Sequence, residues 1–221
     1  VDATESDIIA FINQVFLLFS MLYLIGLGLG MKSMSLEGLE IAKNCAKIYL
    51  EDYTSVAEFS VTELERLIGR KIIVVDRDFV ENKIDNVFMK SKNEDIALLV
   101  MGDVYSATTH YDVYLRARKK NIAVKVINGV SILTAVGITG LSLYNFGKII
   151  SITFGGVKSP YEKYLVNKKN GFHTLFLLDL DTENKKFLAI KEACRYLIDN
   201  GEDENTLVVG CARLGFKNFK I

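Results

Sequence analysis

The strongest strand pattern in the chain is the apolar run Ile96-Ala-Leu-Leu-Val-Met101, which is followed at once by Gly102 and Asp103. An uninterrupted apolar run that ends at a glycine is typical of a strand buried on both faces of a parallel sheet. A second run, Met21-Leu-Tyr-Leu-Ile-Gly26, ends in the same way and opens the glycine-rich stretch Gly26-Leu-Gly-Leu-Gly30. Both runs therefore predict inner strands of an α/β sheet.

Helical segments alternate with apolar runs through the first part of the chain. The spacing predicts helices at 35–45, 62–68, 79–90 and 111–120, and further strands at 47–50, 71–75 and 123–127. Ser35 is a suitable N-cap for the first of these helices, on which Leu36, Leu39 and Cys45 are expected to share a face. Strands that alternate with short helices predict βαβ units and a parallel sheet.

The second part of the chain has a looser form of the same alternation. The pattern predicts a loose helix at 131–146, strands at 148–154, 174–179 and 207–211, and a helix at 187–199. The sequence therefore predicts two α/β lobes. We assign residues 21–146 to the first lobe, residues 147–221 to the second, and residues 1–20 to an N-terminal extension of unknown role.

The apolar stretch Ile8–Gly30 approaches the length of a membrane span. The flank before it, Val1–Asp7, is acidic and lacks the Lys and Arg of a signal peptide or anchor. The stretch also divides into a short helical run and the strand that begins at Met21. The sequence therefore favours a chain without membrane association.

Composition excludes several classes of function. The 221 residues include 27 Lys and Arg against 27 Asp and Glu, a balance that argues against direct nucleic-acid binding. The three cysteines are far apart and form no CxxC pair, which suits buried thiols in a reducing compartment and a cytoplasmic location. With only two histidines and no carboxylate cluster, no metal site is expected.

Ligands of open parallel sheets bind just outside the carboxyl ends of the strands, so the segments that follow the strands are the candidate sites. Three such segments carry glycines or polar side chains: Gly26–Gly30, Met101–His110 and Asn128–Ser131. The first is not a dinucleotide fingerprint, because GxGxxG would need glycine at Met31. Other interpretations stay open: a tight turn for the first segment, helix capping for the second, and a plain turn, which is favoured, for the third.

Pattern alone assigns no catalytic residue. The sequence holds no Ser-His-Asp arrangement, P-loop or paired-carboxylate motif that can be defended. We interpret His173, which precedes a predicted strand, as a packed or capping histidine. The residues by themselves therefore lead to an α/β protein with a ligand crevice.

Several motifs, taken in order, resemble the diphthine synthase family, which belongs to the two-domain, tetrapyrrole-methylase-like class of methyltransferases. Three of them in combination are specific to this family: Ala107-Thr-Thr-His110, Tyr144-Asn-Phe-Gly147 and His173-Thr-Leu-Phe-Leu-Leu-Asp179. The resemblance extends from residue 21 to about residue 216 and includes the stretch Met21–Leu29.

The resemblance implies two α/β lobes, with a parallel-rich sheet in the first, a mixed sheet in the second, and the cofactor in the cleft between them. It implies S-adenosylmethionine as cofactor and S-adenosylhomocysteine as its product. The implied reaction methylates the amino group of the 3-amino-3-carboxypropyl-histidine of translation elongation factor 2, and a homodimer is expected. A tetrapyrrole-type methyltransferase with another acceptor and a degenerate, non-catalytic homologue are the alternatives.

The resemblance also carries over the family's cofactor contacts, position by position. They fall on Leu29, Asp103, Ser106, Ser131, Ile132, Leu177 and Leu214. Asp103 would hold a polar group of the cofactor, Ser131 and Ile132 would present backbone groups, and the leucines would form apolar walls. Val104 stands where the family usually has proline, which is expected to loosen that turn. A further C-terminal strand is usual in the family, so we expect the lobe at 147–221 to be incomplete.

Overall fold

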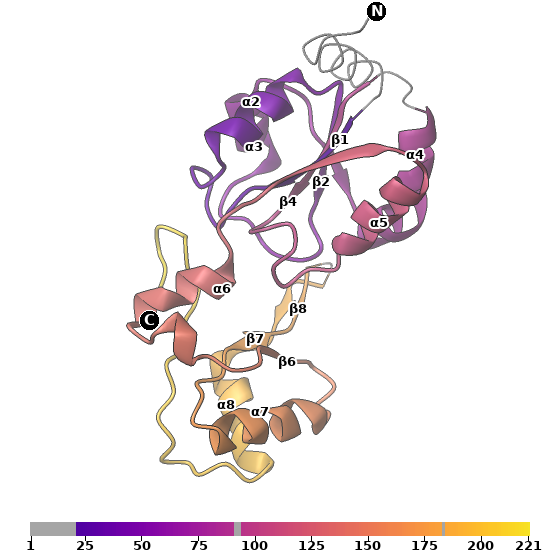
Figure 1. The fold of residues 1–221 in the computed structure, drawn as a ribbon. Helices are drawn as coiled ribbons and strands as arrows, with labels where there is room; N and C mark the ends of the chain where they lie inside the picture. The colour runs from indigo at the N-terminus through magenta and orange to yellow at the C-terminus, as the bar shows by residue number, and fades with distance from the viewer. Residues whose placement is uncertain (1–20, 91–93, 183) are drawn as a thin grey trace, which may run out of the picture. The chain divides into compact units, whose positions relative to one another are not determined.

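The structure is a computed structural model, and it describes residues 21–90, 94–182 and 184–221. The chain divides into two compact units, residues 1–131 and residues 132–221 (Figure 1). This division falls earlier in the chain than the predicted lobe boundary at 146/147. The predicted extension at residues 1–20 lies outside the described residues.

The first unit is built on a five-stranded sheet in the order β3-β2-β4-β1-β5. The strands are β1 (Met21–Gly26), β2 (Lys47–Glu51), β3 (Ile73–Val75), β4 (Ile96–Val100) and β5 (Ala123–Ile127). Every neighbouring pair is parallel, and the register sets Gly26 beside Val100 and Ile25 beside Ile127. The five strands predicted for this part of the chain are confirmed, and β1 and β4, which have the two most apolar runs, lie in its interior.

Helices cover both faces of this sheet. They are α2 (Leu36–Asn44), α3 (Val61–Ile68), α4 (Ile84–Lys90), which continues a π-helical turn (Phe79–Lys83), and α5 (Tyr111–Lys119). Figure 1 shows α2 and α3 on one face and α4 and α5 on the other. The predicted alternation of strand and helix is therefore confirmed as a doubly covered parallel sheet.

The first helix begins where the sequence predicts but turns a different face inward. The Ser35 side chain accepts a hydrogen bond from the Gly38 backbone N–H at 3.0 Å, which confirms the N-cap. Leu36, however, is 80% exposed and Cys45 is buried, so the prediction that these two residues share a face is wrong. The inward residues include Gly38, where a Cβ would lie 2.9 Å from Ile25 Cγ2. Glycine lets the helix approach β1 closely, and the helix is rotated accordingly.

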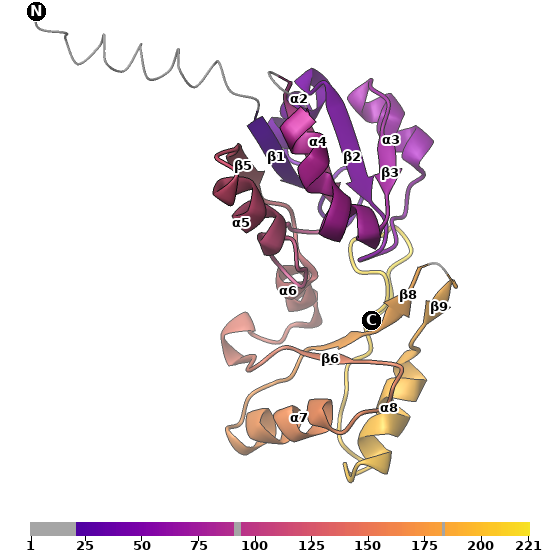
Figure 2. The ribbon, with the colours of Figure 1, turned by 90° about the vertical axis from the view of Figure 1, so that its right-hand side faces the viewer.

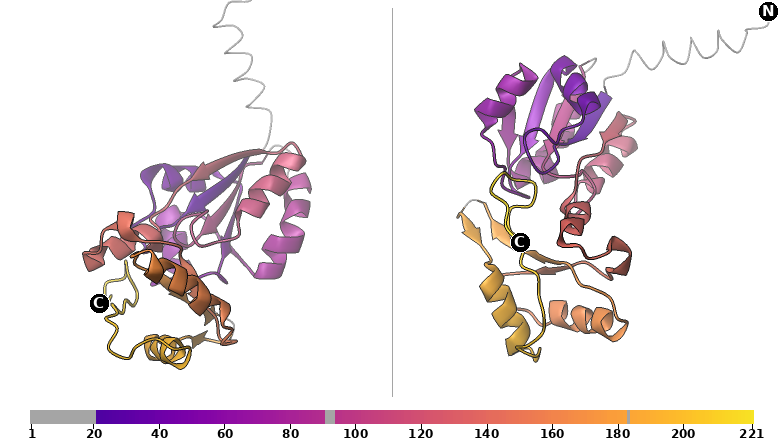
Figure 3. Two further views of the ribbon diagram at one scale, coloured as in Figure 1. Left: turned by 60° about the horizontal axis from the view of Figure 1, so that its bottom comes forward. Right: turned by 90° about the vertical axis from the view of Figure 1, so that its left-hand side faces the viewer.

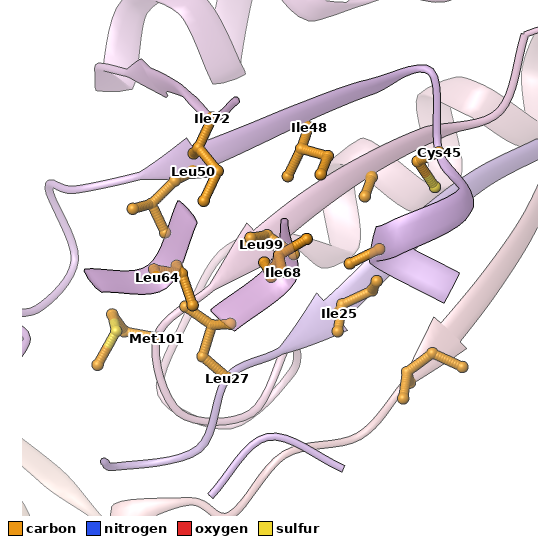
Figure 4. Packing of buried hydrophobic residues seen from close by; sticks show 13 residues of the cluster. Ile25, Leu27, Cys45, Ile48, Leu50, Leu64, Ile68, Ile72, Leu99 and Met101 are labelled. Carbon is orange, nitrogen blue, oxygen red and sulfur yellow. The ribbon is translucent and has the colours of Figure 1, made fainter. Parts of the chain in front are cut away.

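The core of the first unit consists of two hydrophobic clusters, one on each face of the sheet. Side chains alternate along β4, so Leu98 belongs to the cluster that includes residues of α5, while Leu99 belongs to the cluster that includes residues of α3. Figure 4 shows the second cluster, where Ile25, Leu50 and Leu99 lie close to Leu64 and Ile68 of α3. All the residues of β4 belong to one cluster or the other, so this strand is central to the packing of both faces.

The second unit has shorter elements. Its helices are α6 (Ile132–Ala135), α7 (Ser159–Lys169) and α8 (Ile190–Asp199), with 3-10 turns at Val136–Thr139 and Leu143–Asn145. Its strands are β6 (Ile150–Ile152), β7 (Phe176–Leu178), β8 (Leu180–Asp181) and β9 (Lys186–Phe187). β6 pairs with β7 in parallel, and β8 pairs with β9 antiparallel (Figures 2 and 3). The unit therefore combines both kinds of pairing, in two separate small sheets.

Two predictions for the second unit need correction. The strand predicted at 207–211 is wrong: the segment has no regular structure, and Leu207, Val208 and Val209 are 98%, 58% and 51% exposed. An apolar run becomes a strand only where a neighbouring strand pairs with it, and no described residue pairs with this segment as a ladder. The loose helix predicted at 131–146 is broken into short turns, one of which ends at Gly140 in the left-handed conformation.

No helix in the described part of the chain is long and apolar enough to cross a membrane.

We predict that Leu98→Ala lowers the free energy of unfolding by about 3 kcal/mol, since the change opens a cavity in a fully buried position of the inner strand β4. Urea denaturation followed by circular dichroism measures the loss. Ile73→Ala on the edge strand β3 is the control, because Ile73 is 48% exposed, and it should cost less than about 1 kcal/mol. Equal losses for the two variants would contradict the assigned core.

Candidate functional site

The loops that follow β1 and β4 are joined by backbone hydrogen bonds at the carboxyl edge of the sheet. The Leu27 N–H donates to the Val100 carbonyl at 2.8 Å. Gly28 and Gly102 then exchange two hydrogen bonds of 3.0 Å, as an isolated antiparallel bridge. Both glycines have positive φ, 71° and 74°, a conformation that other residues adopt at a cost. The two loops therefore turn back on each other directly after the parallel strands end.

The loop that follows β5 packs against these two loops through glycine. A Cβ on Gly129 would lie 2.1 Å from the Gly102 carbonyl oxygen and 2.9 Å from the Gly28 nitrogen. A Cβ on Gly26 would lie 2.6 Å from the Gly129 nitrogen. These distances are far shorter than van der Waals contact, so the three loops touch backbone to backbone. The glycine-rich turn that the sequence predicts after β1 is thus one part of a contact among three loops.

Asp103 joins two of these loops through four hydrogen bonds. Its Oδ1 accepts from the Tyr105 backbone N–H at 3.0 Å and from the Ser106 hydroxyl at 2.9 Å, both within its own loop. Its Oδ2 accepts from the Asn128 side-chain amide at 3.0 Å and from the Gly129 N–H at 3.1 Å, both in the loop after β5. A carboxylate has about four acceptor positions, so Asp103 is fully used as a clamp between the loops.

The same contacts fix the charge of this carboxylate. Burial alone would raise the pKa of Asp103, which is only 5% exposed, by disfavouring its charged form. The hydrogen bonds from Asn128, Tyr105, Ser106 and Gly129 stabilise the anion and outweigh burial, so the pKa lies below its usual value. Asp103 is therefore a charged acceptor at neutral pH.

Helix capping, the alternative interpretation of the Met101–His110 segment, is not what the structure shows. α5 begins at Tyr111, its N-cap position is His110, and no side chain makes a capping hydrogen bond there. Asp103 and Ser106 bond each other instead, and the Thr108 hydroxyl donates to the Val104 carbonyl at 2.5 Å. The polar side chains of this segment therefore shape the loop and do not serve the helix.

Val104 does not leave this turn loose. Its side chain is fully buried in the cluster that includes Val113 and Ala117 of α5, so it anchors the loop from below. Ala107, further along, has a φ of 63°, in the left-handed region where a residue other than glycine is strained. The loop thus holds one strained residue between a buried anchor and the start of α5, which is typical of a segment shaped for binding.

Of the residues carried over from the family, four lie in the first unit. Asp103 and Ser106 are bonded to each other, and Ser131 is buried two residues after Gly129. Leu29 is half-buried, with Cδ2 at 4.0 Å from the position of a Cβ built on Gly102. The structure therefore brings these four residues to the loops at one edge of the sheet.

A Cβ on Gly102 would meet no atom closer than 3.8 Å, whereas a Cβ on Gly26, Gly28 or Gly129 would clash with its surroundings. The nearest neighbours of a Cβ on Gly102 would be the Val130 carbonyl oxygen at 3.8 Å and Leu29 Cδ2 at 4.0 Å. A hydrogen-bond acceptor and an apolar side chain thus border the same small space. This pair suits a ligand that has both N–H or O–H groups and an apolar surface.

The other three residues belong to the second unit. Ile132 is the first residue of α6, Leu177 lies in β7 opposite Ser151 of β6, and Leu214 is buried in a turn after β9 and α8. The structure describes each within its own unit and does not join them to the four residues of the first unit. Their part in the site stays a prediction.

His173 is held by its backbone. Its N–H donates to the Asn145 carbonyl at 2.8 Å, its carbonyl accepts from the Gly147 N–H at 2.9 Å, and its ring lies 5.6 Å from that of Phe146. The residue is exposed, so the packed histidine predicted there is only partly correct: it contacts one ring at the surface.

Asn128 lies in the third candidate segment but is not among the site residues predicted from sequence. Its amide, like the Gly129 N–H, donates to Asp103, so this segment also serves to hold the loop after β4. The signal was its position directly after a strand that neighbours β1 in the sheet.

Two further buried groups at this edge were also missed. Glu51, fully buried at the end of β2, accepts from the Thr54 N–H at 3.1 Å and the Met101 N–H at 3.4 Å. Burial raises the pKa of Glu51, although hydrogen bonds from Thr54, Met101 and Tyr53 offset part of the shift. Glu51 therefore ties the end of β2 to the end of β4, as Asp103 ties β4 to β5.

His110 lies beneath the loop that Asp103 shapes. It is 1% exposed, and its Nε2 lies 3.4 Å from the Tyr53 hydroxyl. Burial lowers the pKa of His110 to about 4 and raises that of Tyr53 to about 12, so both are neutral at pH 7. The pair joins the loop after β2 to the start of α5 without adding charge to the site.

Comparison with known proteins gives consistent matches over most of the chain. The family described as Tetrapyrrole (Corrin/Porphyrin) Methylases matches residues 21–221. Diphthine methyl ester synthase of Mus musculus is 40% identical over an alignment of 232 positions, which covers 91% of this chain and 83% of that protein. The protein of the same name from Homo sapiens is 39% identical over 91% of this chain and 81% of its own.

The fold has matches among solved structures as well. A crystal structure of diphthine synthase superposes with a TM-score of 0.84 at 33% identity, covering 90% of this chain and 80% of that one.

We predict that Gly129→Ala lowers the free energy of unfolding by about 2–3 kcal/mol, because the added methyl group would meet the backbone of Gly102. Thermal and urea denaturation measure the effect. Gly155→Ala is the matched control, since a Cβ there meets no atom within 4 Å, and it should change stability by less than about 0.5 kcal/mol. A Gly129 variant as stable as this control would refute the contact among the three loops.

We also predict a pH dependence of stability from His110. Its folded pKa of about 4 lies below the ordinary value of about 6.5, so the unfolded chain takes up the proton first as the pH falls. The contribution of neutral His110 to the free energy of unfolding is fully present above about pH 6.5 and is lost as the pH falls from 6.5 to 4. Between pH 7 and pH 5 the free energy of unfolding should fall by about 2 kcal/mol. Urea denaturation at the two pH values should show a smaller decline in His110→Gln. His173→Gln, at the exposed histidine, should keep the wild-type decline; the same decline in both variants would contradict the burial of His110.

Proposed function

Because the chain belongs to the tetrapyrrole (corrin/porphyrin) methylase family, we propose that it is a diphthine synthase-type, S-adenosylmethionine-dependent methyltransferase of diphthamide biosynthesis. Its acceptor is the 3-amino-3-carboxypropyl group on a histidine of translation elongation factor 2. The acceptor nitrogen is the amino group, and the name of the relatives, diphthine methyl ester synthase, adds the carboxylate as a second methyl acceptor.

One observation carries the proposal: the match to diphthine methyl ester synthases extends over most of both chains, and the family match at residues 21–221 includes the loops of the candidate site. A shared fold alone would support only the class of methyltransferase. Identity of 40% that spans the whole match supports the same reaction. This continuity favours elongation factor 2 over a tetrapyrrole as the acceptor.

The residues of the first unit fit a cofactor of this kind. S-adenosylmethionine, when bound, supplies an electrophilic methyl group. Leu29 offers an apolar wall and the Val130 carbonyl an acceptor beside Gly102, where a side chain would otherwise occupy the space. We assign Ser106 and Ser131 to polar contacts in this unit, and Ile132, Leu177 and Leu214 to contacts from the second unit.

Asp103 has a double role in this proposal. All four of its acceptor positions are used by the protein, so its first task is to hold the loops after β4 and β5 in one arrangement. The Asn128 side chain is exposed and is the partner that a polar group of the cofactor can replace most readily. A ligand bound there would keep the carboxylate fully hydrogen-bonded.

The chain contributes positioning above all. Methyl transfer needs the acceptor lone pair in line with the bond that breaks, and fixed loops supply that alignment without a dedicated base. Buried Glu51 and His110 are held by Thr54, Met101 and Tyr53, which makes them supports of the loops and not proton acceptors. The amine proton passes to water or to a side chain near the acceptor.

The proposal also covers the location of the enzyme, its lack of nucleic-acid binding and its oligomeric state. We place the enzyme in the cytoplasm with elongation factor 2, a location that the free cysteines Cys45, Cys194 and Cys211 support. The net charge of zero supports the absence of direct nucleic-acid binding. The homodimer rests on the family resemblance.

We predict that isothermal calorimetry with S-adenosylhomocysteine detects binding to the whole chain and that Asp103→Ala weakens it at least about tenfold, since two loops lose their common acceptor. Asp199→Ala, at the exposed end of α8, is the control and should bind as the wild type does. An Asp103 variant with unchanged affinity would remove this residue from the site.

Methyl transfer tests the acceptor. Labelled S-adenosylmethionine should mark elongation factor 2 that carries the unmethylated 3-amino-3-carboxypropyl-histidine, and should leave a porphyrinoid unlabelled. Label on the porphyrinoid instead would favour the tetrapyrrole-type alternative. Cofactor binding without any transfer to the factor would favour a degenerate homologue.

A further inference from the structure

A strip of exposed and half-buried aromatic, aliphatic and cationic side chains runs along α5 from the Asp103 loop. We name it the α5 strip, and it consists of Tyr105, Tyr111, Tyr114, Leu115, Arg118 and Lys119. Along the helix these residues are spaced three and four apart, which places them on one side. The helix contacts the sheet with Val113 and Ala117, which are buried. Tyr114 packs partly against the same core cluster, and the other strip residues of the helix are exposed.

The apolar part of the strip is larger than folding of α5 requires. Tyr111 is 54% exposed, Leu115 is 41% exposed, and Tyr105 is 37% exposed. The three tyrosine rings contact one another: Tyr111 lies 5.7 Å from Tyr114 and 5.5 Å from Tyr105, centroid to centroid. Mutual contacts hold the rings in place, so little side-chain entropy remains to be lost on binding. Clustered, preordered tyrosines are typical of protein interfaces.

The charges of α5 are divided between paired and unpaired groups. Arg116 bonds Asp112 and Asp85 at 2.7 Å each, and Lys120 lies 3.8 Å from Asp85. Arg118 and Lys119 are exposed and form no salt bridge with any described residue. The surplus charge at the far end of the strip is therefore positive, and a partner with acidic side chains complements it.

The strip is continuous with the candidate site. The Tyr105 backbone N–H donates to Asp103 Oδ1 at 3.0 Å, while the Tyr105 ring contacts Tyr111 and Tyr114. One residue thus belongs to the loop assigned to the cofactor by its backbone and to the exposed strip by its side chain. A partner seated on the strip would lie next to that loop.

We propose that the α5 strip is the docking surface for the protein acceptor, an elongation factor that presents an apolar segment flanked by acidic side chains. The inference rests on the proposed function, because only a macromolecular acceptor needs a surface beyond the reacting group. Tyr111 and Leu115 make the apolar contact, and Arg118 and Lys119 receive the acidic side chains. The positive end also attracts the acceptor over distance, so binding weakens as salt rises.

A double variant of the strip, Leu115→Ser with Lys119→Glu, tests the proposal against a matched control on α2, Leu36→Ser with Lys43→Glu. Both pairs join an exposed leucine to an exposed lysine in the last turn of the same helix. The two helices cover opposite faces of the sheet (Figure 1). Neither variant touches the residues assigned to the cofactor.

Three quantities are measured for each chain: the Kd of S-adenosylhomocysteine, the Kd of unmethylated elongation factor 2 by biolayer interferometry, and KM and kcat for its methylation. The strip variant should raise the Kd and KM of the factor about tenfold, with kcat and cofactor affinity within about twofold of wild type. The control should match the wild type in all three. Raising the salt should weaken the factor's binding to wild type and control more than to the strip variant.

The outcomes separate this proposal from the proposed function. Wild-type affinity of the strip variant for the factor overturns the docking surface, even if methylation itself proceeds. A change in self-association by sedimentation, with affinity for the factor unchanged, assigns the strip to a second copy of the chain and overturns it too. Strip-dependent binding of the factor without methylation supports docking and counts against the proposed function alone.

Discussion

Backbone contact among Gly26, Gly102 and Gly129 is the constraint on which the site depends. A parallel sheet brings the ends of β1, β4 and β5 to one edge, but parallel strands alone leave their loops free to separate. Here a Cβ on Gly129 would stand 2.1 Å from the Gly102 carbonyl oxygen, so the loops meet at a distance that only glycine permits. The packing of α3 and α5 holds the strands in place, and the glycines transmit that order to the loops.

The Asp103 carboxylate adds hydrogen bonds to the loop contact that the glycines make possible. Backbone contact sets the distance between the loops after β4 and β5, and the bonds from Asn128 and Gly129 to Oδ2 set their orientation. Glu51 repeats the arrangement one strand away, where it joins β2 to β4. The two carboxylates differ in the balance of burial and hydrogen bonding: the pKa of Asp103 is lowered, whereas that of Glu51 is raised, because burial outweighs the hydrogen bonds only at Glu51.

Strands could be predicted from sequence where both faces of the strand are buried. The prediction failed where an apolar segment is exposed. β1 and β4 are covered on both faces, so their apolar runs identify them. The apolar run at 207–211 carries the same signal but lies exposed and unpaired by any described strand, because pairing is a tertiary property that one segment does not encode. The shared face predicted for Leu36 and Cys45 failed for a related reason: apolar spacing does not single out Gly38, yet Gly38 is the residue that lies against Ile25 of β1.

The candidate site, too, could be predicted from sequence only in part. Position after a strand pointed to the loops, and the resemblance pointed to Asp103 and Ser106, but neither indicated that Asp103 is used by Asn128 and Gly129. Spacing along the chain does not encode which loops meet in space. Tyr105 is an example: its backbone N–H donates to Asp103, while its ring contacts Tyr111 and Tyr114 of α5. Tyr105 is thus the one residue of the α5 strip that also belongs to the Asp103 loop, so the proposed docking surface and the proposed cofactor site meet at this residue.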